Sequence, residues 1–233
     1  MDPLVLRKVN AERRARRAVV HVTDLGDGRD RLVREGDAVV GPLGEATAIA
    51  FRSGKSGVVE VDGRSYFLNA HLPPARIVVI GAVHISQALA AIAKVAGFDL
   101  TIIDPRTAFA TEERFAGVDL MADWPENVLK ARPLDAYCAL VAVTHDPKID
   151  DFPIRAALDF GCFYVGALGS RKTHAKRIER LTAQGVKQDA LARIAAPIGL
   201  DIGAASPAEI AVAILAQIIQ AFRRRDLRTE VAP

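Results

Sequence analysis

The chain has 233 residues, half of them hydrophobic, which is enough for one full α/β domain and a smaller second domain. Its 31 basic and 28 acidic residues leave a net charge of +3, and the basic runs lie near the two ends, RKVNAERRARR from Arg7 and RRR at 223–225. No aromatic or polar base-reading side chains stand between these cations, which argues against a nucleic-acid surface. We interpret both runs as solvated or flexible ends.

Cysteine content and hydropathy narrow the class further. Cys138 and Cys162 lie 24 positions apart inside apolar runs, a spacing that fits neither a metal motif nor a disulfide framework, so we expect two buried thiols. No apolar segment reaches the roughly 18 residues that a membrane span needs, and the opening MDPLVLRK lacks the apolar core of a signal peptide. The sequence thus predicts a cytoplasmic protein without a membrane partner.

Residues 1–72 are predicted to form a small β-rich N-terminal domain. Short apolar runs separated by Gly and Asp turns indicate strands at 19–22, 32–40, 46–51 and 58–68. The last run is split by Asp62-Gly63, a strong hairpin signal. Pro73-Pro74 then makes a stiff break that suits a domain boundary.

From 75 to 226 the pattern changes to alternating strands and helices. A helix predicted at 84–97 carries Ile85, Leu89 and Ile92 on one apolar face and stops at Gly97. Apolar runs predict strands at 76–81, 98–104, 136–144 and 162–166. This alternation predicts an α/β fold with a Rossmann-like, doubly wound parallel sheet.

The last predicted helix has a clear start. The segment Ser206-Pro207-Ala208-Glu209 is a capping box with proline at the first helical position. Apolar residues then recur at helical spacing through Ile214 and Ile218. We therefore expect this helix to pack firmly on the core.

Chemically active side chains gather where the strands of this sheet end. Ligands of doubly wound sheets bind beyond the carboxyl ends of the strands. The segments expected there are GAVHIS (81–86), DPR (104–106), THDP (144–147), GALGSRKTH (166–174) and GLDIGA (199–204). Glycine, acid, histidine and cation concentrate in these segments and hardly elsewhere, so we expect the functional site at this edge.

The segment GAVHIS is an incomplete dinucleotide-binding fingerprint. Gly81 holds the first glycine position, but the second and third positions hold Val83 and Ser86, and a valine there pushes a pyrophosphate outward. Asp104, 23 residues after Gly81, stands where a ribose-binding acid would stand, and Arg106 is either a phosphate ligand or an ordinary surface arginine. These residues leave open a nucleotide site and a Rossmann-shaped domain that does not bind NAD.

Cations open the helix that follows the fourth predicted strand. Ser170 is its expected N-cap, and Arg171 and Lys172 fill the first turn, where each cation opposes the helix dipole at a cost of a few tenths up to roughly 1 kcal/mol. A solvated face that tolerates the mismatch is the plain explanation. The alternative is a phosphate or similar anion, held by these cations and by the helix-start amides after a turn at Gly166 and Gly169.

Metal and hydrolase chemistry find less support. His84, His145 and His174 come from three different loops and could together hold a metal, but none has an i,i+4 partner or an HExxH signature. A triad of Ser170, His145 and Asp201 lacks the G-x-S-x-G elbow. We therefore predict neither a metal site nor catalytic residues.

Several segments together carry a family resemblance. GAVHISQALAAIAKVAGFDLTIIDPR, THDP, YVGALGSRKTHAKR and APIGLDIGA, in that order, resemble the C-terminal domain of the XdhC/CoxI family over roughly residues 76–224. These proteins are accessory factors of xanthine dehydrogenase, carbon monoxide dehydrogenase and related molybdenum hydroxylases. The resemblance implies a non-catalytic chaperone that binds molybdenum cofactor, which is a phosphorylated pterin (molybdopterin) or its dinucleotide, protects it during sulfuration and passes it to the apo-enzyme.

The resemblance also implies partners and ligand residues. The partners are an apo molybdenum hydroxylase, a cysteine desulfurase, and a second copy of the chain or a related XdhC-like protein. Carried over position by position, the family motif nominates as cofactor-binding residues Gly81, His84, Asp104, Arg106, His145, Asp146, Gly166, Gly169, Ser170, Arg171, Lys172, Thr173, His174 and Asp201.

Two departures from the family pattern bear on the ligand. The family usually has GAGH where this chain has GAVH, so Val83 speaks against a nucleotide half. Nothing before Pro73 matches the family's SGGC-E type segment, so the sequence gives no support to a cysteine role in sulfur transfer. The alternatives are an NAD(P)-dependent oxidoreductase, which Val83 and Ser86 disfavour, and a nucleotide-sensing Rossmann module.

Overall fold

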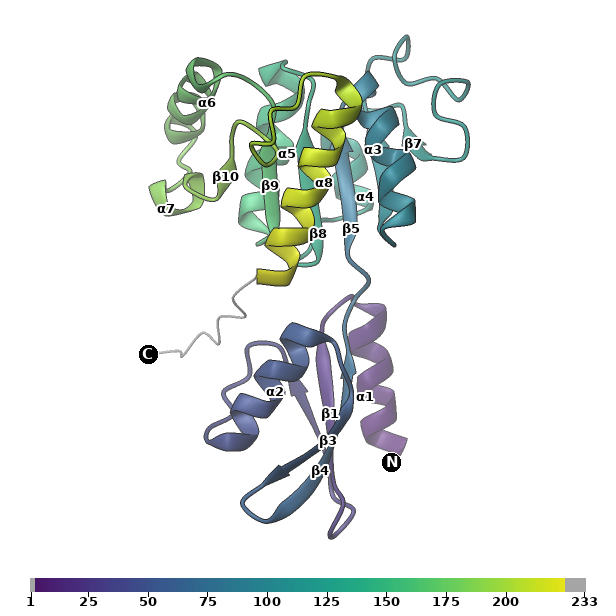
Figure 1. Cartoon of the computed structure of the whole chain (residues 1–233), viewed down its shortest axis with the longest axis vertical. Helices are drawn as coiled ribbons and strands as arrows, with labels where there is room; N and C mark the ends of the chain where they lie inside the picture. Colours follow the sequence, from purple (N-terminus) through teal and green to yellow (C-terminus); the bar gives the residue numbers. More distant parts are fainter. Residues whose placement is uncertain (1–2, 225–233) are drawn as a thin grey trace. The chain divides into compact units, whose positions relative to one another are not determined.

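The computed structural model describes residues 3–224, which divide into two compact units, one ending at Pro73 and the other running from Pro74 to Phe222 (Figure 1). The first unit holds a four-stranded antiparallel sheet in the order β2-β1-β4-β3. Its elements are α1 (Pro3–Arg14), β1 (Val19–Asp24), β2 (Asp30–Arg34), α2 (Pro42–Ser53), β3 (Gly57–Val61) and β4 (Arg64–His71).

The predicted hairpin is confirmed. Val61 pairs with Arg64, so Asp62 and Gly63 form a two-residue loop, and both have positive φ angles of 51° and 72°. Two successive positive φ angles define the type I′ turn, whose twist matches the twist of the paired strands. This turn fixes the register of β3 against β4.

Three predictions for this unit are wrong. Residues 46–51 were expected as a strand but lie in α2, where Pro42 opens the helix and Gly54 ends it in a left-handed conformation. The expected strand at 32–40 ends at Arg34. The basic run from Arg7 was expected to be solvated or flexible, yet residues 7–14 lie in α1, whose buried Glu12 pairs with Arg17 and Arg34. Of the second basic run, Arg225 lies outside the described residues.

The second unit is a doubly wound α/β domain, as predicted. Its six-stranded sheet is parallel throughout, in the order β10-β9-β8-β5-β6-β7, so the winding reverses between β5 and β8. In chain order its elements are β5 (Arg76–Ile80), α3 (His84–Val95), β6 (Asp99–Ile103), β7 (Asp119–Met121), α4 (Pro125–Ala131), β8 (Cys138–Ala142), α5 (Pro147–Asp159), β9 (Tyr164–Ala167), α6 (Arg171–Ala183), α7 (Gln188–Leu191), β10 (Ile194–Ala195) and α8 (Pro207–Arg224).

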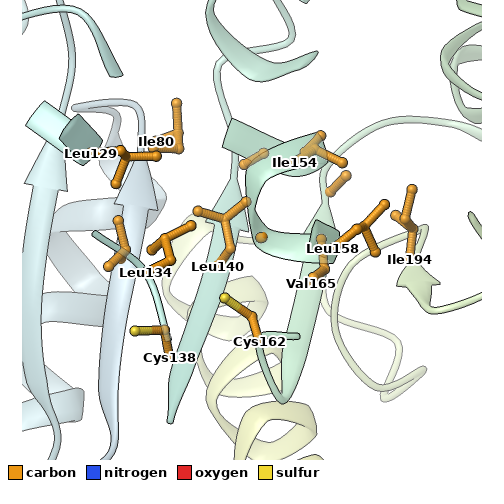
Figure 2. Packing of buried hydrophobic residues seen from close by; sticks show 14 of the residues in the cluster. Ile80, Leu129, Leu134, Cys138, Leu140, Ile154, Leu158, Cys162, Val165 and Ile194 are labelled. Atoms are coloured by element: carbon orange, nitrogen blue, oxygen red, sulfur yellow. The ribbon is translucent and has the colours of Figure 1, made fainter. Parts of the chain in front are cut away.

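Each face of this sheet is covered by its own helices. Side chains of a strand alternate between the two faces, so Val78 and Ile80 pack with α4 to α7, whereas Ile77 and Val79 pack with α3 and α8. Figure 2 shows part of the first cluster, in which Leu140 lies close to Ile154 of α5. The central strands are apolar on both sides because both sides are buried.

The two cysteines are buried free thiols, as predicted. Cys138 and Cys162 are fully buried, and both belong to the cluster of Figure 2. The guanidinium of Arg76 donates a hydrogen bond to the Cys138 sulfur at 3.0 Å.

Both predicted helix caps are present. The Ser170 hydroxyl accepts from the Thr173 amide at 3.2 Å at the start of α6. At the start of α8 the Ser206 hydroxyl accepts from the Glu209 amide, and the Glu209 carboxylate accepts from the Ser206 amide, which completes the capping box. Among the helices of residues 3–224, none is long and apolar enough to cross a bilayer.

Gly166 on β9 is a packing glycine. A Cβ at this position would lie 2.7 Å from Ile198 Cδ1 and closer still to the Tyr164 hydroxyl. We expect Gly166→Ala to lower the free energy of unfolding by about 1–3 kcal/mol through overpacking. Urea unfolding checks this, with Gly57→Ala as the control because no atom lies within 4 Å of a Cβ there. Equal midpoints for the two variants would contradict the packing role.

Candidate functional site

A cavity of about 240 Å³ lies between α5, α6 and the loop that leaves β8. Its volume is below the roughly 300–1,000 Å³ of sites that enclose a whole drug-sized ligand, so it suits one chemical group of a larger molecule. Its wall is almost entirely polar and charged. The lining residues are His145, Pro147, Asp150, Asp151, Lys172, Thr173, Lys176, Arg177 and Arg180.

The loop after β8 turns sharply to bring one acid into this cavity. His145 takes a left-handed backbone conformation, with φ of 64°, and Asp146 caps α5 by accepting from the Lys148 amide at 2.9 Å. One turn further, Asp150 faces back toward the loop and accepts from the Thr144 hydroxyl at 2.7 Å. The loop and the first turn of α5 are thereby locked together.

Asp150 is a buried acid with one free oxygen. Its exposed fraction is 1%, and Oδ2 has no hydrogen-bond partner among the described residues. Burial raises the pKa of Asp150 to about 6, although the bond from Thr144 and the charge of Arg177 act in the opposite direction. Near neutral pH this carboxyl therefore exchanges its proton easily.

Arg177 is a buried cation with two free nitrogens. Its exposed fraction is 2%, and only Nη2 is engaged, donating to the Leu168 carbonyl at 2.9 Å. Nε and Nη1 have no partner within residues 3–224. Burial lowers the pKa of Arg177, while the charges of Asp150 and Asp151 raise it. A guanidinium in this state offers two N–H groups to an incoming acceptor.

The remaining charges leave a cationic surplus in the cavity wall. Arg180 is already neutralised, because it donates two hydrogen bonds to the Asp151 carboxylate, at 2.6 and 3.0 Å. Lys172 and Lys176 form no ion pair within the described part of the chain. The wall thus carries four cations against two carboxylates, which favours an anionic ligand.

The cavity gathers only some of the residues nominated from the sequence. His145, Lys172 and Thr173 line it. Asp146 and Ser170 cap the two helices that form it, and Gly169 makes the turn before α6 with φ of 134°. Gly166, Arg171 and His174 are not among its lining residues.

The other nominated residues lie at the ends of β5, β6 and β10. Asp104 is fully buried, and its two oxygens accept from the Ala82 amide and from the backbone and guanidinium of Arg106. Its carboxylate therefore braces the loop that Gly81 opens. His84 and Asp201 are exposed.

The histidines do not converge. Within residues 3–224, no group of three or more His, Cys, Asp or Glu side chains is placed to hold a metal ion. His145 lines the cavity, whereas the Nδ1 atom of His174 is buried without a partner. Burial, followed by the charge of Arg177, lowers the pKa of His174.

Sequence reasoning missed most of the cavity wall. Asp150, Asp151, Lys176, Arg177 and Arg180 were not nominated, although they surround the nominated Lys172 and Thr173. A signal for them exists, because Lys172, Lys176 and Arg180 recur every four residues and so share one face of a helix. The burial of Asp150 and Arg177 has no such signal.

Comparison with known proteins places this domain in a family. The family described as the XdhC Rossmann domain matches residues 77–218. The chain is 32% identical over 159 residues to a Bacillus subtilis protein described as a probable component of xanthine dehydrogenase, covering 68% of this chain and 46% of the relative. It is 30% identical over 169 residues to the uncharacterized protein YqeB of Escherichia coli, covering 67% and 29%.

A third relative and one solved structure complete the comparison. The molybdenum cofactor insertion chaperone PaoD of Escherichia coli is 27% identical over 146 residues, covering 63% of this chain and 40% of PaoD. The chain thus spans less than half the length of these relatives. A crystal structure described as a xanthine dehydrogenase of Bacillus halodurans shares the fold, with a TM-score of 0.63 and 24% identity over 99% of this chain and 66% of that one. With the XdhC Rossmann domain matched across most of its second unit, this chain belongs to the XdhC family.

Proposed function

We propose that this protein is an accessory factor in the maturation of a molybdenum hydroxylase, and that it binds molybdenum cofactor as cargo without turning it over. Support comes from family membership and from two relatives, one named as a probable component of xanthine dehydrogenase and the other as a molybdenum cofactor insertion chaperone. The cofactor is a phosphorylated pterin, so a protein that carries it needs a seat for a phosphate group.

The observation that carries this proposal is the buried Arg177. A buried guanidinium with two unpartnered N–H groups costs folding free energy unless something else is gained. Arginine pairs with phosphate through parallel N–H bonds, and Lys172 and Lys176 add positive charge to the same cavity. A phosphate in the cavity would satisfy the two free nitrogens.

A dinucleotide-dependent oxidoreductase is a weaker candidate. Ser86 fills the third glycine position of the fingerprint, where it is fully buried and donates to the Gly81 carbonyl. The acid expected to bind ribose, Asp104, is fully engaged with its own chain. Both features disfavour NAD(P) as a ligand.

The finer parts of the proposal concern partners. In this account the cargo is protected while a cysteine desulfurase sulfurates it, and is then passed to an apo-enzyme such as xanthine or carbon monoxide dehydrogenase, with the chain acting as a homodimer or beside a related XdhC-like protein. Their basis is the family resemblance of residues 76–224. No cysteine of the chain is assigned a sulfur-transfer role, since both thiols are buried in the core.

A transfer assay tests the proposal. Protein incubated with molybdenum cofactor and freed of excess by gel filtration is expected to retain about one pterin per chain or per dimer, and to activate a cofactor-free molybdenum hydroxylase better than free cofactor does. Serum albumin processed in the same way is the control. If the gel-filtered protein carries no pterin and gives no gain in hydroxylase activity, the proposed function is wrong.

A further inference from the structure

The cavity between α5 and α6 contains an acid that a plain anion site would not include. Asp150 and Arg177 are both almost fully buried, both line the cavity, and both keep unpartnered polar atoms. Their charges influence each other, yet they form no direct ion pair among the contacts of residues 3–224. One group faces the cavity as a donor and the other as an acceptor.

This pairing of groups suits a ligand that accepts and donates at the same time. The free Nε–H and Nη1–H of Arg177 can only donate. The free Oδ2 of an ionised Asp150 can only accept, and it would repel an anion that carries no proton. A ligand that satisfies both must present negatively charged oxygens to Arg177 and a hydroxyl to Asp150.

We propose that this cavity is selective for a phosphate monoester, whose anionic oxygens accept from Arg177 while one proton is shared between the phosphate and Asp150. A phosphate monoester loses its second proton at a pKa of about 6, so it can supply that proton near neutral pH. Sulfate and a phosphate diester have the same tetrahedral shape but no such proton. Asp150 is thus the residue that sets specificity, and Arg177 supplies the affinity.

The surroundings of Asp150 support a shared proton rather than a permanent charge. Burial disfavours the ionised carboxyl and raises its pKa toward that of the ligand, which makes sharing energetically even. The charged and titratable groups that face Asp150 from its own helix, from α6, from the β8 loop and from the end of β6 are Asp146, Asp151, Lys172, Lys176, Arg177, Arg180, His145 and Arg106.

The phosphate site stands on the cavity alone, but the identity of its natural ligand rests on the proposed function. If the cargo is molybdenum cofactor, the inference selects the molybdopterin form, which ends in a phosphate monoester. In a dinucleotide form the same phosphate lies in a diphosphate bridge and has no proton to share at neutral pH. This chain should then retain molybdopterin in preference to its dinucleotide.

Calorimetric titration with three small anions tests the selectivity. Methyl phosphate, dimethyl phosphate and sulfate are titrated into the full chain at pH 7. We expect methyl phosphate to bind at least tenfold more tightly than the other two. In Asp150→Asn the preference should fall below threefold, because the amide accepts from a hydroxyl and donates to an ionised oxygen equally well. Asp159→Asn, the same change at the exposed end of α5, should keep the wild-type preference.

The pH dependence gives a second readout. Toward pH 5 Asp150 carries its own proton and can donate to sulfate, so the wild-type preference should shrink, while that of Asp150→Asn stays constant. Equal affinity for methyl phosphate and sulfate in the wild type at pH 7, or no heat from any anion at millimolar concentration, would overturn the inference. Monoester selectivity without retention of molybdenum cofactor would instead refute the proposed function and leave the phosphate site standing.

Discussion

Asp150→Asn should make the protein more stable above pH 7. The pKa of this buried acid is raised from 3.8 to about 6, so the folded state binds its proton more tightly than the unfolded state does. Between these two values stability falls as pH rises, because the folded state must give up a proton that it favours. The full shift corresponds to about 3 kcal/mol, an order-of-magnitude figure.

Urea unfolding of both proteins from pH 4 to pH 8 measures this effect. At pH 4 the wild type and Asp150→Asn should have nearly equal stability, because the amide oxygen can still accept from Thr144. The gap should open through pH 5 to 6 and level off above pH 7. A constant difference across the range, or a wild type that gains stability on Asp150 ionisation, would show that another group neutralises this carboxylate. A stabilising change at a site residue is expected where function opposes stability.

Arg106→Ala should lower the free energy of unfolding by about 3 kcal/mol at pH 7. Asp104 is fully buried, and burial alone would raise its pKa, but the hydrogen bonds from Arg106 and the Ala82 amide outweigh burial and lower it. Removing one partner of a buried pair leaves a charge without compensation, which costs about 3–5 kcal/mol. The lower end applies because the Arg106 side chain is 31% exposed.

An exposed ion pair provides the matched control. Arg132 donates to Asp119 at 2.7 Å, with about half of each side chain exposed, so Arg132→Ala should cost less than about 1 kcal/mol. The double variant Asp104→Asn with Arg106→Ala should recover part of the loss. The penalty of Arg106→Ala should also shrink as pH falls, because the unpaired Asp104 then becomes protonated. Equal penalties for both arginine variants would contradict the bracing role of Asp104.

The parallel sheet was predictable because its signals are local. Strands β5 and β8 are continuous apolar runs, and the caps at Ser170 and Ser206 are marked by side chains within four residues. The first unit was harder, because short apolar runs suit helix and strand alike. Residues 46–51 became helical since Pro42 and Gly54 supply the helix ends.

The candidate site was only partly predictable because its key property is burial. The cations at the start of α6 drew attention to Lys172, which does line the cavity, but equally to Arg171, which does not. Asp150 and Arg177 look like ordinary helix-surface residues in the sequence. Their meaning comes from the packing of α5 beside α6, which buries both side chains and leaves three of their polar atoms without partners in residues 3–224.

The most direct test of the proposed function is a titration of molybdenum cofactor against wild type, Lys172→Ala with Lys176→Ala, and Arg171→Ala. Lys172 and Lys176 line the cavity and are exposed, so their loss should spare folding but weaken cofactor binding by about 1–3 kcal/mol. Arg171 lies on the same helix start outside the cavity wall, so its loss should change the affinity less than threefold. The account predicts that the double variant alone releases the cofactor, and equal affinities in all three proteins would contradict it.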